Sequence, residues 1–134
     1  MHYKKLTFDQ KGDNRGHLVV VEGLKDIPFE IKRIFYIYGS NRDVVRGSHA
    51  NRYSEFVFIN VSGQSKIKID NGKNVEIVEL SEAHTGLYLD KMVWKEMYDF
   101  SPDSVLLVLT NTEYDNQEYI RDYNEYLKEV NTNV

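Results

Sequence analysis

Short runs in which apolar and polar residues alternate fill most of this chain, and turn-forming residues separate the runs. Alternation at every second position gives a β-strand one apolar face. The runs SKIKID (65–70) and VEIVEL (75–80) flank an Asn-Gly pair, which is a strong signal for a β-hairpin. Further strands are predicted for residues 3–8, 17–22, 31–38, 44–63, 87–89, 93–100 and 105–110, the last of these being almost wholly apolar and therefore central. Many short strands at this spacing predict an all-β jelly-roll barrel or sandwich.

The pattern changes near the C-terminus. In residues 113–130, Tyr119-Ile120, Tyr123 and Tyr126-Leu127 recur at steps of three and four, which predicts one amphipathic C-terminal α-helix. Residues 9–16, DQKGDNRG, are rich in Gly, Asn and Asp and are predicted to form a turn. With 134 residues and no linker-like segment, the chain is predicted to form a single domain over residues 1–134.

The composition of the chain excludes several classes of function. The net charge is −4 and no basic block occurs, which argues against binding to nucleic acids or membrane surfaces. The chain has no cysteine, so disulfides, thiolate catalysis and zinc–thiolate sites are excluded. No segment reads as a membrane span or as the hydrophobic core of a signal peptide, and we expect a cytoplasmic protein.

The stretch VVRGSHANRYSEFVFINVSG (44–63) is the most informative one. If it is a continuous strand, His49, Asn51 and Glu55 share one face, and Val57 and Ile59 continue that line. A polar start and an apolar end predict a barrel with a wet mouth and a dry floor, and such mouths often bind small molecules.

Several side chains around this stretch suit acid–base chemistry. His49 and Glu55 can both transfer protons near neutral pH when their surroundings tune them. Arg46 is a candidate for binding phosphate or stabilising an oxyanion. Tyr36 and Tyr38, which share a face of the preceding strand, are candidate proton donors to a ligand oxygen.

A metal site is the alternative reading of the same residues. Barrels of the cupin type hold a metal through two closely spaced histidines, a glutamate and a distant histidine. Here His49, Asn51 and Glu55 fall near that spacing, and His84 is the candidate for the distant ligand. Asn is a poor ligand for transition metals, and His84 lies in a predicted turn. We therefore predict no metal and no other cofactor.

Four segments resemble the sugar 3,4-ketoisomerase family of WxcM-like cupins. They read FYIYGSNRDVVRGSHANR, VSGQSKIKIDNG, VWKEMYDFSPDSVLLVLTNTEYD and EYIRDYNEYL, and together they span about residues 31–127. The resemblance implies a jelly roll that forms a homodimer with exchanged N-terminal strands. It also implies an enzyme that needs no metal and moves the keto group of dTDP-4-keto-6-deoxyglucose from C4 to C3. The downstream use that the family suggests is amino transfer at C3 and cell-surface glycan synthesis.

The chain departs from the family at one catalytic position. The family motif is typically RG-x-HAH, whereas this chain has RGSHAN, so His49 matches the first histidine and Asn51 replaces the second. We expect His49 to be the general acid/base, Asn51 to donate a hydrogen bond to the enediolate oxygen, and Glu55 to take the missing basic role. Arg52 and Arg121 are weaker candidates for pyrophosphate contacts, and an ion pair on the terminal helix is the preferred reading of Arg121.

Three alternatives remain open at this point. The loss of the second histidine is compatible with a non-catalytic cupin that only binds dTDP-sugars. An epimerase would act on the same substrates, because it too removes a proton next to a ketone. A metal-dependent cupin oxygenase or isomerase is the third.

Overall fold

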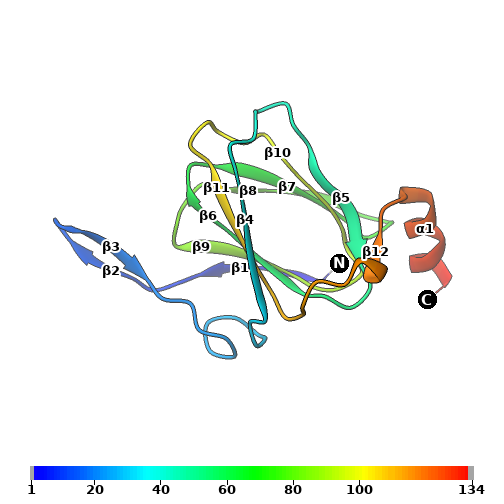
Figure 1. Cartoon of the computed structure of the whole chain (residues 1–134), viewed down its shortest axis with the longest axis horizontal. Helices are drawn as coiled ribbons and strands as arrows, with labels where there is room; N and C mark the ends of the chain where they lie inside the picture. Colours follow the sequence, from blue (N-terminus) through cyan, green and yellow to red (C-terminus); the bar gives the residue numbers. More distant parts are fainter. Residues whose placement is uncertain (1, 133–134) are drawn as a thin grey trace.

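The structure is a computed structural model, and it describes residues 2–132. Twelve strands, a 3₁₀ turn and one α-helix follow one another in these residues (Figure 1). They are β1 (Tyr3–Thr7), β2 (Gln10–Asp13), β3 (Gly16–Val19), β4 (Arg33–Tyr38), β5 (Arg46–Asn51), β6 (Phe56–Ser62), β7 (Ser65–Asp70), β8 (Val75–Leu80), β9 (Thr85–Leu89), β10 (Trp94–Tyr98), β11 (Val105–Thr110), η1 (Asn116–Glu118), β12 (Tyr119–Ile120) and α1 (Tyr123–Thr132).

Two five-stranded antiparallel sheets face each other and form the barrel. One has the order β1-β9-β6-β11-β4, and the other has the order β12-β5-β10-β7-β8. β7 and β8 pair in the predicted hairpin, and β11 lies between two neighbours, as its apolar sequence indicates. The predicted all-β jelly-roll class with a C-terminal helix is confirmed.

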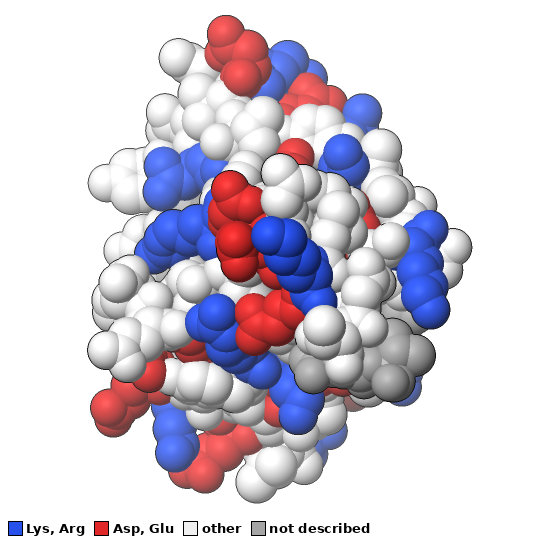
Figure 2. All heavy atoms as spheres, turned by 90° about the vertical axis from the view of Figure 1, so that its right-hand side faces the viewer, with Lys and Arg blue, Asp and Glu red and all other residues white. Residues whose placement is uncertain are grey.

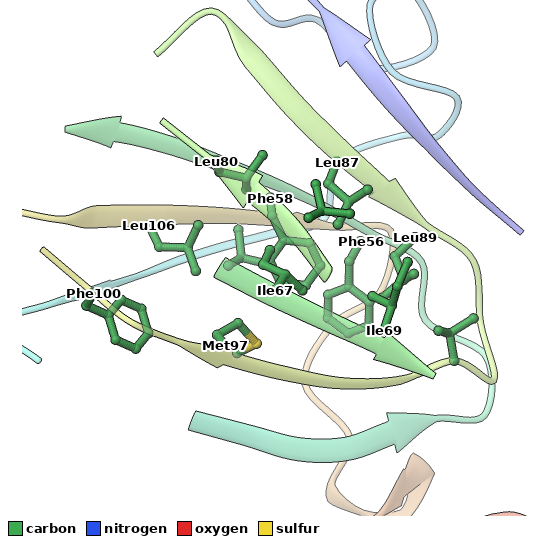
Figure 3. Packing of buried hydrophobic residues seen from close by; sticks show 13 residues of the cluster. Phe56, Phe58, Ile67, Ile69, Leu80, Leu87, Leu89, Met97, Phe100 and Leu106 are labelled. Atoms are coloured by element: carbon green, nitrogen blue, oxygen red, sulfur yellow. The ribbon is translucent and has the colours of Figure 1, made fainter. Parts of the chain in front are cut away.

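The main hydrophobic core fills the space between the two sheets. Side chains from both sheets meet there, including Phe56 and Phe58 of β6 and Ile67 and Ile69 of β7 (Figure 3). A second apolar cluster covers the outer face of β6, where Val57 packs against the segment that follows β3. Alternation along β6 therefore serves two cores, one on each face of the strand.

The prediction of a single extended run over residues 44–63 is wrong. β5 ends at Asn51 and β6 begins at Phe56, and these strands belong to different sheets. Residues 52–55 cross from one sheet to the other, so the alternation restarts. Consequently Phe56 points into the barrel, whereas Val57 points outward.

The C-terminal helix begins ten residues later than its apolar spacing suggests, at Tyr123 instead of residue 113. Tyr119 and Ile120 instead form β12, which pairs with Asn51 and Ala50 of β5. The helix starts where the side chain of Asp122 accepts a hydrogen bond from the Glu125 N–H at 3.0 Å, a typical N-cap.

Residues 9–16 also differ from prediction, because they contribute strand as well as turn. β2 and β3 pair with each other in a hairpin that projects from the barrel (Figure 1). Every residue of β2 is exposed, and Leu18 of β3 is 55% exposed. A protruding two-stranded hairpin is marginal by itself.

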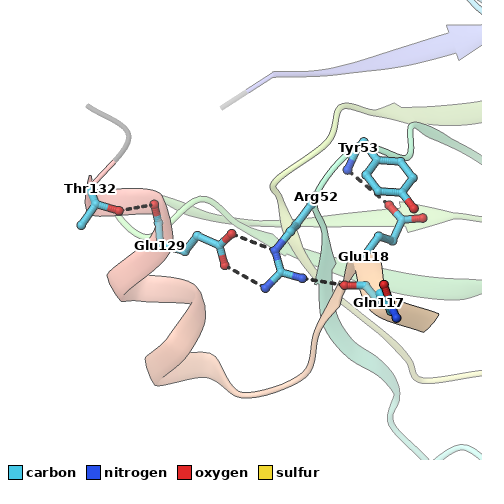
Figure 4. Close-up of polar contacts among 6 residues, drawn as sticks. All are labelled: Arg52, Tyr53, Gln117, Glu118, Glu129 and Thr132. Atoms are coloured by element: carbon cyan, nitrogen blue, oxygen red, sulfur yellow. Dashed lines mark hydrogen bonds and ion pairs between the residues drawn. The ribbon is translucent and has the colours of Figure 1, made fainter. Parts of the chain in front are cut away.

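Two sets of contacts fasten α1 to the barrel. The buried Tyr126 hydroxyl donates to the backbone carbonyls of Met92 at 2.8 Å and Asp70 at 3.1 Å. The Arg52 guanidinium donates to both carboxylate oxygens of Glu129, at 2.8 and 3.2 Å (Figure 4).

On the face that carries α1, basic and acidic side chains are interspersed (Figure 2). In residues 2–132 no helix combines the length and apolarity needed to cross a bilayer.

Replacing Tyr126 by Phe should loosen the helix. The variant keeps the ring but leaves two buried carbonyls without their donor, so we expect a loss of about 1–3 kcal/mol in the free energy of unfolding, measured by urea denaturation. Tyr114→Phe is the matched control, because the Tyr114 side chain is exposed and its hydroxyl bonds only the exposed side chain of Asn116. Equal stability of the two variants would contradict this role of the Tyr126 hydroxyl.

Candidate active site

A cavity of about 210 Å³ opens between the two sheets. Its basic side chains are His49 and Arg46 of β5 and Lys95 of β10. Phe35 of β4 and the inward-facing phenylalanines of β6 form its apolar walls. Sites for drug-sized ligands span about 300–1,000 Å³, so this cavity suits one small ring.

An open groove of about 410 Å³ adjoins the cavity. Arg46, His49 and Tyr119 line both spaces, which makes them continuous. Tyr114 and Arg121 line the groove but not the cavity. The Arg121 guanidinium stacks on Tyr119, 4.5 Å from the centre of its ring. The groove thus offers two cations and two aromatic rings beside the cavity.

A β-bulge aims His49 at this cavity. Lys95 is opposite His49 whereas Glu96 is opposite Gly47, so Ser48 is the extra residue in β5. Gly47 has φ +87°, and a Cβ there would lie 3.0 Å from the carbonyl oxygen of Lys95. Only glycine meets both conditions, and this accounts for the glycine in the Arg-Gly pair.

His49 is held in its neutral form. Burial lowers the pKa of His49 to about 3. The nearby positive charges of Lys95 and Arg121 act in the same direction, with smaller effects. The ring makes an edge contact with Tyr119, with 4.8 Å between the ring centres. Its Nδ1 is buried and has no hydrogen-bond partner among the described residues. A neutral imidazole of this kind can accept a proton from a ligand.

Lys95 is the second titratable group in the cavity, and it is fully buried. Burial lowers its pKa to about 7, while the charge of Glu118 acts in the opposite direction. Its Nζ donates a hydrogen bond of 2.9 Å to Oδ1 of Asn51 and lies 4.3 Å from the centre of the Phe56 ring. The Nδ2 of Asn51 is buried without a partner among residues 2–132.

The buried carboxylate of Glu118 supports the connection between β5 and β6. It accepts a hydrogen bond of 3.2 Å from the backbone N–H of Tyr53 (Figure 4). It also accepts hydrogen bonds from the backbone N–H of Ser54 at 2.8 Å and from the Ser54 hydroxyl. Arg52 anchors the same connection to the carbonyl of Gln117 at 2.8 Å. The chain that leaves Asn51 is thereby fixed to η1.

The structure brings four of the predicted site residues together. His49 and Arg46 line the cavity, Arg121 lines the adjoining groove, and Asn51 lies beneath it as the acceptor for Lys95. Arg121 donates a hydrogen bond to Asn116 at 3.0 Å and has no ion pair among the described residues, so the preferred reading of Arg121 as an ion pair is wrong.

Four predicted residues lie elsewhere. Glu55 does not share a face with His49, because the chain changes sheets before it, and its carboxylate accepts hydrogen bonds from Tyr88 and Asn111 on the other side of β6. The Arg52 guanidinium faces Glu129 of the helix instead of the groove. Alternation along β4 turns both Tyr36 and Tyr38 outward, and their side chains are 60% and 72% exposed. Tyr36 therefore only borders the cavity, and Tyr38 does not line it.

Lys95 and Tyr119 are the residues that sequence reasoning missed. The sequence did contain a signal for Lys95. It lies at every second position with Val93 and Met97, so it shares a strand face with two apolar residues that belong to the inner core. A lysine on the apolar face of a strand is unusual. Tyr119 had none, because its sequence pattern indicated a helix.

The described residues offer no cluster of metal ligands. Within residues 2–132, no group of three or more His, Asp or Glu side chains could hold a metal ion. His84 lies in the turn before β9, where its Nε2 is 3.5 Å from Glu82.

Fold and site define the class of the protein as a cupin-type barrel with two buried titratable side chains, His49 and Lys95, in its cavity. Residues 1–131 match the family model described as "FdtA: WxcM-like, C-terminal", and the chain belongs to this family. The TDP-4-oxo-6-deoxy-alpha-D-glucose-3,4-oxoisomerase of Aneurinibacillus thermoaerophilus is 38% identical over 130 residues, which cover 97% of this chain and 94% of that protein.

Solved structures agree with this assignment. A 3,4-ketoisomerase from Helicobacter canadensis is 47% identical and superposes with a TM-score of 0.95 over 98% of each chain. QdtA, a sugar 3,4-ketoisomerase from Thermoanaerobacterium thermosaccharolyticum solved in complex with TDP, is 38% identical with a TM-score of 0.95, covering 98% of this chain and 96% of its own. The resemblance noted in the sequence is therefore confirmed.

The low pKa of Lys95 predicts a pH-dependent stability. Between pH 7 and the ordinary lysine pKa of 10.5 the unfolded chain binds the proton that the folded protein has released, so Lys95 makes the free energy of unfolding rise with pH in that range. Below pH 7 the folded protein carries the buried charge at its full cost. Lys95→Met should therefore stabilise the protein more at pH 6 than at pH 10 in urea titrations. An equal effect at both pH values would contradict this.

Proposed function

We propose that the protein is a sugar-nucleotide 3,4-ketoisomerase. It converts dTDP-4-keto-6-deoxy-D-glucose to a dTDP-3-keto-6-deoxyhexose by metal-independent proton transfer through an enediol or enediolate. The observation that carries this proposal is the neutral imidazole of His49 in a small, mostly apolar cavity. The named activities of the relatives support it.

The reaction needs a base next to C3 of the sugar. The C4 ketone acidifies the C3–H bond; when a base takes that proton, the electron pair forms the C3–C4 double bond and the C4 oxygen gains a proton. Return of a proton to C4 and loss of the proton on the C3 oxygen then give the 3-keto sugar. Neutral His49 is the base, and its conjugate acid can return a proton to C4.

The groove suits the rest of the substrate. A sugar nucleotide carries two phosphates and a flat base, and the groove carries Arg46, Arg121 and two tyrosine rings. Arginine binds phosphate oxygens with its planar donors, and aromatic rings stack on bases. We assign Arg46 and Arg121 to the diphosphate, and we assign no ligand contact to Arg52.

A proton NMR time course in deuterated water tests the proposal. Added to dTDP-4-keto-6-deoxyglucose, the protein should produce a 3-keto species with deuterium at C3 or C4, and coupling constants would give the configuration at C4. Exchange confined to C5 would indicate an epimerase instead. Binding without any exchange would identify a non-catalytic binding protein and overturn the proposal.

Replacement of His49 supplies the control. His49→Gln removes the base while keeping a polar side chain, so turnover should fall about 10²–10⁴-fold, the usual contribution of a general base. His84→Gln should leave turnover unchanged, because His84 lies in a distant turn.

We further propose that the enzyme is a homodimer that exchanges N-terminal strands. The projecting hairpin of β2 and β3 and the exposed side chains of Ile34, Tyr36 and Tyr38 on the edge strand β4 are surfaces that a second copy would cover. We also propose a cytoplasmic enzyme whose product enters cell-surface glycan synthesis, as the family resemblance implies.

Light scattering after size-exclusion chromatography tests the dimer. The mass should be twice the 15.8 kDa of the chain. Leu18→Asp together with Ile34→Asp should shift the protein towards monomer, because both substitutions charge exposed apolar positions. A wild-type mass of one chain would reject the dimer.

A further inference from the structure

Lys95 is hard to explain as a structural residue. It lies on the inward face of β10 between Val93 and Met97, and these two side chains belong to the apolar core. A buried ammonium loses its hydration, and stability normally favours an apolar side chain of the same size. A residue retained at such a cost points to a function at the place where its charge lies.

That place is the cavity, directly beside His49 on the same face of the sheet. Lys95 and His49 are paired residues of β10 and β5, and both line the cavity. The bond to Asn51 fixes the ammonium at 2.9 Å, and it is the only hydrogen bond that Nζ makes among the described residues. An ammonium has three donors, so two remain for a ligand.

The charged groups around Lys95 allow its ammonium to release a proton and bind it again. β5 contributes His49, which is neutral, and the exposed Arg46; the segment after β12 contributes Arg121. η1 contributes Glu118, the one carboxylate that acts on Lys95 in favour of its charge. The neighbouring faces of β6 and β7 are apolar, with Phe56, Phe58, Ile67 and Ile69.

We propose that Lys95 is a second catalytic residue, an acid that lies beside the base His49 and protonates the C4 oxygen of the keto sugar. This inference rests on the proposed ketoisomerase function and deepens it. Asn51 is its positioning residue, because the amide oxygen of Asn51 holds the ammonium in place. Lys95 thereby supplies the second acid–base group. Glu55 cannot supply it, because its carboxylate lies on the other side of β6.

The cycle closes without any co-reactant. His49 removes the C3 proton while the ammonium of Lys95 gives a proton to the C4 oxygen, which leaves an enediol, an imidazolium and a neutral amine. The amine then takes the proton from the C3 hydroxyl as the C3 carbonyl forms, and the imidazolium protonates C4. Both residues return to their starting states, and only the keto group has moved.

Turnover of position-95 variants tests this assignment on the full-length protein. Lys95→Met should lower kcat about 10²-fold or more, the usual contribution of a general acid, with a smaller change in KM. Lys91→Met is the matched control, because Lys91 is exposed in the turn before β10, and it should retain wild-type kcat. Circular dichroism and the urea midpoint confirm that each variant is folded.

The pH profile separates catalysis from a structural role. Because the free enzyme needs protonated Lys95 and its pKa is about 7, kcat/KM should fall as the pH rises above 7. Lys95→Arg keeps the charge but cannot release the proton, so it should lose that fall and turn over slowly. Folded Lys95→Met with kcat within threefold of wild type overturns the role of Lys95 alone. A wild-type protein that exchanges no proton at C3 or C4 overturns the ketoisomerase function and this inference together.

Discussion

The site depends on how β5 is held between β10 and β12. The bulge at Gly47 and Ser48 resets the alternation, so that His49 faces the cavity while Ala50 packs outward against the helix. Pairing of β12 with the end of β5, and the bonds of Glu118 to the connection that follows, fix the strand where it leaves the sheet. Without these restraints the imidazole would have no defined direction.

Loss of water inside the barrel then sets the chemistry. Burial disfavours the charged forms of both His49 and Lys95, but their ordinary pKa values differ by several units. The same environment therefore leaves a neutral imidazole and an ammonium poised near neutral pH in one cavity. Two groups with separated pKa values are what an enediol reaction needs, since one must accept a proton where the other donates. The outer groove, with its two arginines, adds binding for the anionic part of the substrate.

Much of the fold could be predicted from local pattern. The strands Ser65–Asp70, Val75–Leu80 and Val105–Thr110 were predicted with the bounds that the structure shows, because alternation, an Asn-Gly turn and an apolar run are local signals. The pattern failed where tertiary contacts outweighed it. Tyr119 and Ile120 have helical spacing, yet pairing with β5 makes them a strand. The 44–63 stretch has continuous alternation, yet its two halves belong to different sheets.

The sequence by itself determined the fold class, the family and the importance of His49, because RGSHAN and the segments around it are short-range patterns. Only the tertiary structure decided which side chains share the cavity. Glu55 is six residues from His49 but faces the other side of β6, whereas Lys95 is far away in the chain and lies directly opposite. Strand pairing joins distant residues, and a change of sheet separates close ones, so no local pattern carries this information.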